Sequence, residues 1–453
     1  MTIDPPPSAW PERMASWRAT RNDKRARRFR EQCDLPADRP IVMTGHQPAL
    51  WHPGVLAKFI ACDAAAGALD AAPVWIVPDQ DEVDPFALRL PLADAQDRLR
   101  SDTRRFAEPT PTGFAACSAP AQRVTPVDAS DAPLESIRSG AQRIANAFAA
   151  HDGDPTAARQ GQAALRDLIS PLVDPAPTLF ASDLARTDLF AELLDRMARD
   201  PKAVTSAYNA AAESLPQAGV GRLIVNEVTD RYELPLWRVP PGEPRRRVYA
   251  HELADIPRTH LAPRALLMTA IVRLAGCDLF IHGTGGGAYD AVTDRWIDAW
   301  LAEPLAPVAV VTATLRLPLR SEIPTPEGAA KVRWAAHHAR HDPTLLGDDG
   351  AARRKRDAVE RIRALRAAGE DPAAVFQDMQ RDLRDYREAN RERLDELVHA
   401  ADLAEARLAE RDIVADRTWA FPLYGDETLD GLRSDIAGAF AHVDASVLKK
   451  TPV

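Results

Sequence analysis

The sequence has few cysteines and no long apolar run. Its 453 residues include four scattered cysteines without a Cys-x-x-Cys pair, so neither a disulfide framework nor a thiolate zinc site is indicated. No stretch of about 18 or more apolar residues occurs, and the opening residues lack the apolar segment of a signal peptide. We therefore expect no export, no membrane partner and a reducing, cytoplasmic location.

The sequence also has fewer basic than acidic residues. The chain has 57 Lys and Arg against 66 Asp and Glu, which gives a formal net charge of −9. Because an acidic surface repels a phosphate backbone, we expect no nucleic-acid partner. Residues 10–32 are locally rich in arginine, including Arg18, Arg21 and Arg30. We interpret this segment as a surface helix with a solvated basic face.

Apolar residues make up 45% and charged residues 27% of the chain, which is typical of a folded globular protein with a real core. Glycine is sparse, with 22 residues, whereas proline is frequent, with 38. Proline between apolar segments bounds strands and starts helices, so the pattern predicts short elements with clear ends.

The periodicity predicts an α/β fold with a parallel sheet. A short apolar run at 41–43 is followed by a polar loop, an apolar helix over 53–69 and a second apolar run at 74–77, which together predict a βαβ unit. The pattern returns at 279–281 and 308–315, with a glycine-rich junction and a helix between these two strands.

The remaining segments are predicted to be insertions and a helical arm. Residues 92–133 look irregular, and two apolar runs on either side of Thr229 and Asp230 predict an antiparallel strand pair. The predicted segments are an N-terminal helical segment (1–40), the first half of the core (41–133), a helical insertion (134–215), the second half of the core (216–330), a helical arm (331–413) and a tail packed on the core (414–453).

Residues 352–412 are helical and highly charged in pattern, and Gly369 to Pro372 should divide them into a shorter and a longer helix that form an antiparallel hairpin. The longer helix has apolar residues with the 3,4 spacing of a coiled-coil seam, namely Phe376, Met379, Leu383, Tyr386 and Asn390. Two interpretations stay open: a helix packed along its own domain, or an exposed arm for dimerisation.

Three polar motifs follow predicted strands. The first, T-G-H-Q-P-A-L-W-H-P-G at 44–54, places His46 and His52 before a helix N-terminus, where backbone N–H groups favour an anionic ligand. The second motif, at 75–84, contains carboxylates that suit an amine ligand or a general base, unless they are solvated acids at a strand end. Ligands bind beyond the carboxyl ends of parallel strands, so we expect these motifs to share one crevice.

The third motif, H-G-T-G-G-G-A-Y-D at 282–290, lies between a strand and a helix, and its glycines allow a ligand to approach the backbone closely. Zinc is an alternative, with His46, His52, Asp81 and His282 as conceivable ligands. Because their spacing matches no compact ligand signature, we predict no metal site. A G-x-S-x-G nucleophile elbow is absent.

At these motifs the sequence resembles the bacillithiol biosynthesis cysteine-adding enzymes. T-G-H-Q-P-A-L-W-H-P-G is similar to the family's T-G-Q-Q-x-G-L-F-T-G-P, and V-W-I-V-P-D-Q-D-E-V-D to its F-W-x-x-x-E-D-H-D-F-E-E. H-G-T-G-G-G-A-Y resembles G-G-P-G-E-x-x-Y, and D-R-T-W-A-F-P-L-Y-G resembles the family's C-terminal Q-E-R-x-x-x-x-L-P-Y-x-x-x-Y-G region. The motifs occur in the family's order and span nearly the whole chain.

The resemblance implies a Rossmann-like core with helical insertions, a C-terminal α-helical coiled-coil hairpin and a homodimer joined through that arm. It also implies the condensation of cysteine with glucosaminyl malate. Thr44, Gly45 and Gln47 match the family directly, as do the glycines at 283 and 285 and Tyr289. The sequence departs from the family where His46 replaces Gln, Asp81 replaces His and Gly286 replaces Glu, and at 52–54, where H-P-G stands for T-G-P.

We therefore predict a ligase or transferase that condenses a cysteine-like amino acid with the amine of a small anionic metabolite. The predicted catalytic residues are His46, Asp79, Asp81 and Glu82. The predicted substrate-binding residues are Thr44, Gly45, Gln47, His52, Gly54, Lys58 and Tyr289. The predicted phosphate-binding residues are Gly283, Gly285, Gly286 and Gly287, with ATP or ADP as the candidate cofactor.

Two alternatives stay open at this point. One is a metal-dependent hydrolase or a nucleotidyl transferase on the same core. The other is a non-enzymatic interaction protein that uses the helical arm to bind its partner.

Overall fold

The computed structural model describes residues 1–449 and divides into two compact units. The first unit comprises residues 1–90, 102–317 and the chain from 417 onward, and the second comprises 91–101 and 318–416. Among the described residues, no helix is both long and apolar enough to cross a bilayer.

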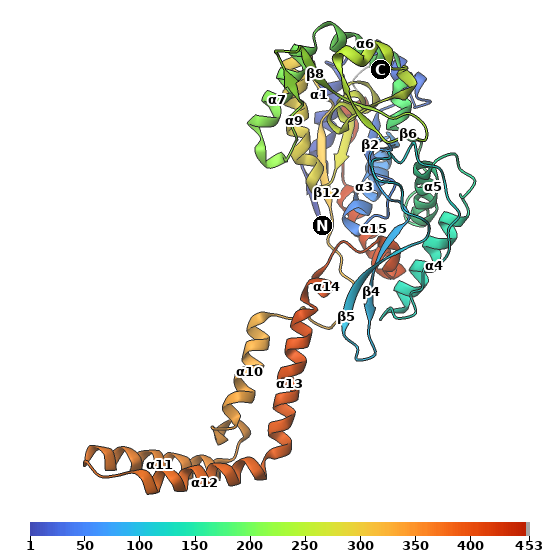
Figure 1. Ribbon diagram of the computed structural model, residues 1–453. Helices are drawn as coiled ribbons and strands as arrows, with labels where there is room; N and C mark the ends of the chain where they lie inside the picture. Colours follow the sequence, from blue (N-terminus) through green and yellow to red (C-terminus); the bar gives the residue numbers. More distant parts are fainter. Residues whose placement is uncertain (450–453) are drawn as a thin grey trace. The chain divides into compact units, whose positions relative to one another are not determined.

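The first unit is built on a six-stranded mixed sheet, and its strands are mostly parallel (Figure 1). The strand order is β1 (Thr2–Asp4), β12 (Val308–Thr312), β11 (Leu279–His282), β2 (Ile41–Gly45), β3 (Ala72–Val77) and β6 (Thr178–Phe180). Only the edge pair of β1 and β12 is antiparallel among these neighbours. The predicted α/β class and the four predicted strands of this sheet are therefore confirmed.

The chain direction across the sheet changes between β2 and β11. From β2 the chain runs through α3 (Pro53–Leu69) to β3 on one side, and from β11 it runs through α9 (Thr284–Leu301) to β12 on the other side. The loops that leave the carboxyl ends of β2 and β11 therefore diverge, which leaves room for a ligand between them.

The predicted helical insertion at 134–215 also contains a strand of the main sheet. Its helices are α4 (Glu135–Ala149), α5 (Ala157–Ile169), α6 (Asp188–Arg199) and α7 (Pro201–Ser214). Between α5 and α6, the three residues of β6 pair with β3, with Thr178 opposite Trp75. The sequence did not predict this strand, because three residues are too few to show a hydrophobic period.

A second, antiparallel sheet forms around β8 (Arg231–Arg238), which pairs with β7 (Val225–Asn226), β9 (Arg246–Tyr249) and β10 (Leu261–Pro263). The predicted strand pair around Thr229 and Asp230 is confirmed, and Asp230 has a positive φ of 50° at the turn. The segment predicted to be irregular contains β5 (Leu99–Arg105), which pairs with β4 (Ala87–Ala93). That prediction was wrong for 99–105, because β5 is rich in exposed charged residues.

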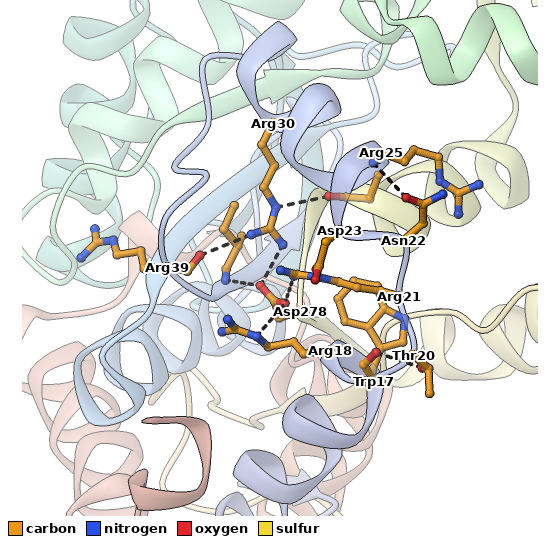
Figure 2. A network of polar contacts seen from close by, with 12 residues as sticks. Trp17, Arg18, Thr20, Arg21, Asn22, Asp23, Arg25, Arg30, Arg39 and Asp278 are labelled. Atoms are coloured by element: carbon orange, nitrogen blue, oxygen red, sulfur yellow. Dashed lines mark hydrogen bonds and ion pairs between the residues drawn. The ribbon is translucent and has the colours of Figure 1, made fainter. Parts of the chain in front are cut away.

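The basic N-terminal segment forms two helices, α1 (Trp10–Arg18) and α2 (Asp23–Gln32), and part of it is buried (Figure 2). The carboxylate of Asp278 is fully buried and accepts hydrogen bonds from Arg21, from Arg30 Nη2 at 2.8 Å and from the Ile41 amide at 2.7 Å. Arg18 Nε lies 4.0 Å from the same carboxylate. The prediction of a solvated basic face was therefore wrong for these three arginines.

Further helices of the first unit are α8 (Ala265–Ile271), α15 (Asp426–Phe440) and α16 (Ser446–Lys449). The C-terminal segment of this unit packs through its aromatic residues. Trp419, Phe421 and Tyr424 are buried, and the Phe421 amide donates to the Trp51 carbonyl oxygen at 2.6 Å. This contact joins the segment to the loop between β2 and α3.

The second unit is formed mainly by α10 (Pro326–Ala339), α11 (Asp349–Ala367), α12 (Ala373–Ala389), α13 (Arg391–Ala409) and α14 (Arg411–Ala415). Helix α10 packs against α13, and α11 against α12 (Figure 1). The predicted break is confirmed, because Gly369 has a φ of +77° between α11 and α12.

The sequence predicts one longer helix in the arm, and this prediction was wrong in one respect: a second break divides it into α12 and α13. Asn390, with a φ of −112°, separates α12 from α13. Met379, Leu383 and Tyr386 of the predicted seam are buried, and Tyr386 Oη donates to the Ala339 carbonyl oxygen at 2.7 Å. Phe376 is 47% exposed, so the predicted seam is only partly buried within the chain.

Candidate functional site

A cavity of about 530 Å³ lies at the carboxyl ends of β2 and β11, where the strand order reverses. Each of the three sequence motifs contributes to its lining. The predicted site residues that line the cavity are Gly45, His46, Gln47, His52, Gly54, Lys58, Asp81, Gly283, Gly285, Gly286 and Tyr289. The two loops and the glycine-rich junction thus face one another, as the strand topology predicts.

Four predicted site residues are not among the described residues that line this cavity: Thr44, Asp79, Glu82 and Gly287. Thr44 Oγ1 donates to the Ile281 carbonyl oxygen at 2.9 Å and so joins β2 to β11. Glu82 accepts a hydrogen bond from the Gly113 amide at 2.7 Å. These contacts give Thr44 and Glu82 roles in holding strands and loops together.

Asp79 forms its hydrogen bonds with Ser182, which does not line the cavity. It is almost fully buried, and its Oδ1 accepts a hydrogen bond from the Ser182 amide at 2.9 Å, next to β6. Burial raises the pKa of Asp79 to about 6, although the hydrogen bonds from Ser182 oppose this shift. Its carboxylate therefore ties the loop after β3 to the segment after β6.

Two helix N-termini point their first turns toward the cavity. His52 is the N-cap of α3, and its Nδ1 accepts a hydrogen bond from the Gly54 amide at 3.0 Å, which places the proton of a neutral ring on Nε2. Helix α9 begins at Thr284, so the predicted glycine loop is the first turn of a helix. Among the side chains of residues 1–449, none caps α9, so its first amides suit an anionic ligand.

Gly45 is the last residue of β2 and lies very close to the backbone of β3. A Cβ at this position would lie 2.1 Å from the Ile76 carbonyl oxygen, so only glycine fits without a shift of the strands. The Gly45 carbonyl oxygen accepts a hydrogen bond from Lys58 Nζ at 2.7 Å. The close packing of β2 and β3 thus fixes the position of the Gly45 carbonyl oxygen, to which the Lys58 amine donates.

Lys58 lies in the second turn of α3 and is only 4% exposed. Burial lowers the pKa of its ammonium group to about 7. The neutral amine is therefore more accessible at physiological pH for Lys58 than for an exposed lysine.

His46 has a pKa that is lowered to about 3, first by burial and then by the nearby Lys58 ammonium. The ring is therefore neutral at physiological pH. A base this weak is poorly matched to the proton transfer that the sequence predicts for it, because general bases work best with a pKa near the working pH.

His282 is the histidine that sequence reasoning considered only as a metal ligand. It ends β11, lines the cavity, and places Nε2 2.6 Å from Asp290 Oδ2 in α9. Asp290 is buried and its Oδ1 also accepts a hydrogen bond from Arg273 Nη1 at 3.3 Å. The contact meets the distance of an ion pair but not the geometry of a hydrogen bond. An imidazole close to a buried carboxylate is a candidate for proton transfer.

Asp81 lies at the end of the cavity formed by the acidic loop. Gln47 Nε2 donates to its carboxylate at 3.0 Å, and Arg245 Nη1 lies 3.5 Å from it. Burial raises the pKa of Asp81, while the Gln47 and Arg245 contacts lower it in part. Gln47 and Arg245 thus hold this carboxylate in the cavity wall.

No protein-family model matches this sequence, and no similar curated protein was found. Within residues 1–449, no group of three or more His, Cys, Asp or Glu side chains is arranged to hold a metal ion. The described residues therefore give no support to the zinc alternative with His46, His52, Asp81 and His282 as ligands.

Gly286 leaves the space that the His282 ring occupies. A Cβ on Gly286 would lie 2.2 Å from His282 Nδ1, so the substitution Gly286→Ala should push the ring away from Asp290. We expect a loss of about 1–3 kcal/mol in the free energy of unfolding, which is typical of overpacking, and a changed His282 ring signal in NMR spectra.

Gly285→Ala is the matched control. It lies in the same turn of α9, and an added Cβ there meets no atom within 4 Å. Urea denaturation should show little change or a small gain in stability for this variant, since alanine favours helix. Equal stabilities of the two variants would contradict the proposed fit of His282 against Gly286.

Proposed function

We propose that this chain is a ligase-type enzyme that joins the carboxyl group of a cysteine-like amino acid to the amine of a small anionic metabolite. The motif resemblance to the cysteine-adding enzymes supports this proposal. The observation that carries it is the arrangement of one cavity, in which two helix N-termini lie together with Asp81 and with His282, whose ring contacts Asp290. These groups suit an anion, an ammonium group and a proton transfer, respectively.

In this proposal, the anionic group of the acceptor binds at the first turn of α9, beside Lys58. The acceptor amine lies near Asp81 and attacks the activated carboxyl carbon of the amino acid, and the activating group leaves. The amine must lose a proton as the new C–N bond forms. His282, which lies beside Asp290, takes this proton in place of the weakly basic His46.

Amide formation from a free carboxylate in water is uphill, so an activated donor is needed, and ATP or ADP is the candidate cofactor. The uncapped first turn of α9, with glycine at 285 and 286, fits a phosphate group, since backbone amides are exposed there without Cβ atoms. A bound nucleotide would supply the activating phosphate or adenylate group. The residues of this chain would bind and orient it.

The proposal also includes a Rossmann-like core and a coiled-coil arm. The reversal of strand order between β2 and β11 supports a Rossmann-like core. The helix pairs of the second unit, with Phe376 exposed on α12, support a coiled-coil arm through which two copies form a homodimer.

The direct test is the formation of the amide. The full chain is incubated with cysteine, ATP and glucosaminyl malate, and the product is followed by mass spectrometry. We expect an amide product with the wild type and none with His282→Gln, because the amine keeps its proton. Substrate binding by His282→Gln, measured by isothermal titration calorimetry, should change little.

Asp81→Asn tests the binding arrangement. Removal of the carboxylate charge should weaken the binding of the amine-bearing acceptor by at least about tenfold, since hydrogen bonds to charged groups contribute roughly 1.5–3 kcal/mol. His151→Gln, in an ion pair with Asp167 outside the cavity, is the control and should behave as the wild type. Acceptor binding that Asp81→Asn leaves unchanged, or the lack of any binding and product, would contradict the proposed function.

A further inference from the structure

Lys58 places a buried amine in the cavity wall. Its Nζ donates to the Gly45 carbonyl oxygen and lies 5.8 Å from the centre of the Phe59 ring. Within residues 1–449, no carboxylate lies within ion-pair distance of this nitrogen. By contrast, the buried Arg273 faces two carboxylates, those of Asp290 and Asp294. An unbalanced buried ammonium is costly, which favours the neutral form of Lys58.

The neighbours of this amine suit covalent chemistry. A Cβ on Gly283 would lie 3.7 Å from Lys58 Cδ, so the lysine side chain reaches the start of α9. The amides of that turn can hold an anionic group, and His282 with Asp290 lines the same cavity. A nucleophile, an anion-binding turn and a proton carrier thus share one space of about 530 Å³.

We propose that Lys58 is a nucleophile that forms an imine with a small aldehyde or ketone carrying a carboxylate or phosphate group. The Nζ lone pair attacks the carbonyl carbon, and the C=O electron pair moves to oxygen, which takes up a proton. The nitrogen then loses a proton, which gives a neutral carbinolamine. Its hydroxyl group takes up a second proton and leaves as water while the nitrogen lone pair forms the C=N bond, and the nitrogen then gives up its remaining proton. His282 carries the proton between nitrogen and oxygen. No oxidant or reductant is needed.

This activity goes beyond the proposed amide ligase and does not depend on it. Burial adds support, because it keeps a large neutral fraction of the Lys58 amine at pH values where exposed lysines are protonated. Desolvated lysines of this kind are the ones that form Schiff bases in enzymes.

The test is the trapping of the imine in the full wild-type chain. The protein is incubated with glyoxylate and sodium borohydride near pH 7.5, and modified lysines are located by peptide mass spectrometry. We expect Lys58 to be modified at a glyoxylate concentration at least about tenfold below that needed for Lys202. Lys202 is the internal control, because it is exposed and its pKa is raised by Glu227.

The pH dependence and the choice of aldehyde sharpen the test. Modification of Lys58 should level off above about pH 8, whereas that of Lys202 should keep rising. Acetaldehyde, which has no anionic group, should require a higher concentration than glyoxylate. Lys58→Arg should lose the modified peptide and keep the Lys202 product.

Three results would overturn the proposal: modification of Lys202 without Lys58, a pH profile of Lys58 like that of Lys202, or equal labelling by acetaldehyde and glyoxylate. All three results need only wild-type protein, so they decide the matter even if Lys58→Arg does not fold. Amide formation without imine trapping would overturn this inference alone. Trapping without amide formation would contradict only the proposed ligase function.

Discussion

Replacing Lys58 with methionine should raise the free energy of unfolding by about 3 kcal/mol at pH 7. The folded chain holds the Lys58 pKa near 7, against 10.5 for the ordinary side chain. Each pKa unit corresponds to about 1.4 kcal/mol, so the buried amine costs roughly 4 kcal/mol at neutral pH. Methionine removes that cost and gives up the hydrogen bond to Gly45, which contributes about 1 kcal/mol.

The sign of the pH dependence follows from the same two pKa values. Between pH 7 and 10.5 the unfolded chain binds the additional proton at Lys58, so the stability of the wild type rises with pH. Below pH 7 both states are protonated and the cost is constant. The advantage of Lys58→Met should therefore be largest at and below pH 7 and should disappear toward pH 10.

Urea denaturation at about pH 6, 8 and 10 measures this difference. Lys331→Met, at an exposed position in α10, is the control and should change the stability by less than about 0.5 kcal/mol at each pH. A Lys58→Met protein that is less stable than the wild type at pH 7, by an amount that does not vary with pH, would show that the Lys58 amine is not desolvated as described.

The parallel strands of the first unit could be predicted because each is a buried apolar run bounded by proline or glycine. This holds for β2 and β3 and, later in the chain, for β11 and β12. The short edge strands β1 and β6 could not be predicted, because three residues show no period and their pairing depends on distant partners. The position of the cavity followed from the parallel strands alone, since their carboxyl ends share one edge.

The orientation of individual side chains at the cavity could not be derived in the same way. Asp79 and Asp81 are two residues apart, yet Asp79 binds the Ser182 amide and only Asp81 lines the cavity. The conformation of the loop decides this, and no sequence period describes it. Likewise, the pair of His282 and Asp290 depends on how α9 packs back on β11.

The basic N-terminal segment shows why composition alone misleads at charged positions. A chain with a net charge of −9 favours the interpretation of exposed arginines as solvated. Their partner, Asp278, lies about 250 residues further along the chain, directly before β11. Only the tertiary structure brings the arginines and Asp278 together (Figure 2). As a result, Arg18 and Arg30 are buried although the sequence predicts a surface helix.

Asp278→Asn should lower the free energy of unfolding by about 3–5 kcal/mol, the range observed when one partner of a buried ion pair is removed. The asparagine keeps the size of the side chain but leaves Arg21 and Arg30 without their buried counter-ion. The Ile41 amide, which donates to the same carboxylate, starts β2, so the loss should also loosen the strand that leads to the cavity. Hydrogen exchange at β2 should therefore speed up in this variant.

The matched control is Asp188→Asn. Asp188 pairs with Arg28 of the same basic segment at 3.0 Å, but both side chains are more than half exposed. Solvent screens such a pair, so its loss should cost far less than the loss of the buried Asp278 carboxylate and should matter less at high salt. If urea denaturation gave the same small loss for both variants, the arginines around Asp278 would be solvated after all, and the buried cluster would not hold the N-terminal helices to the sheet.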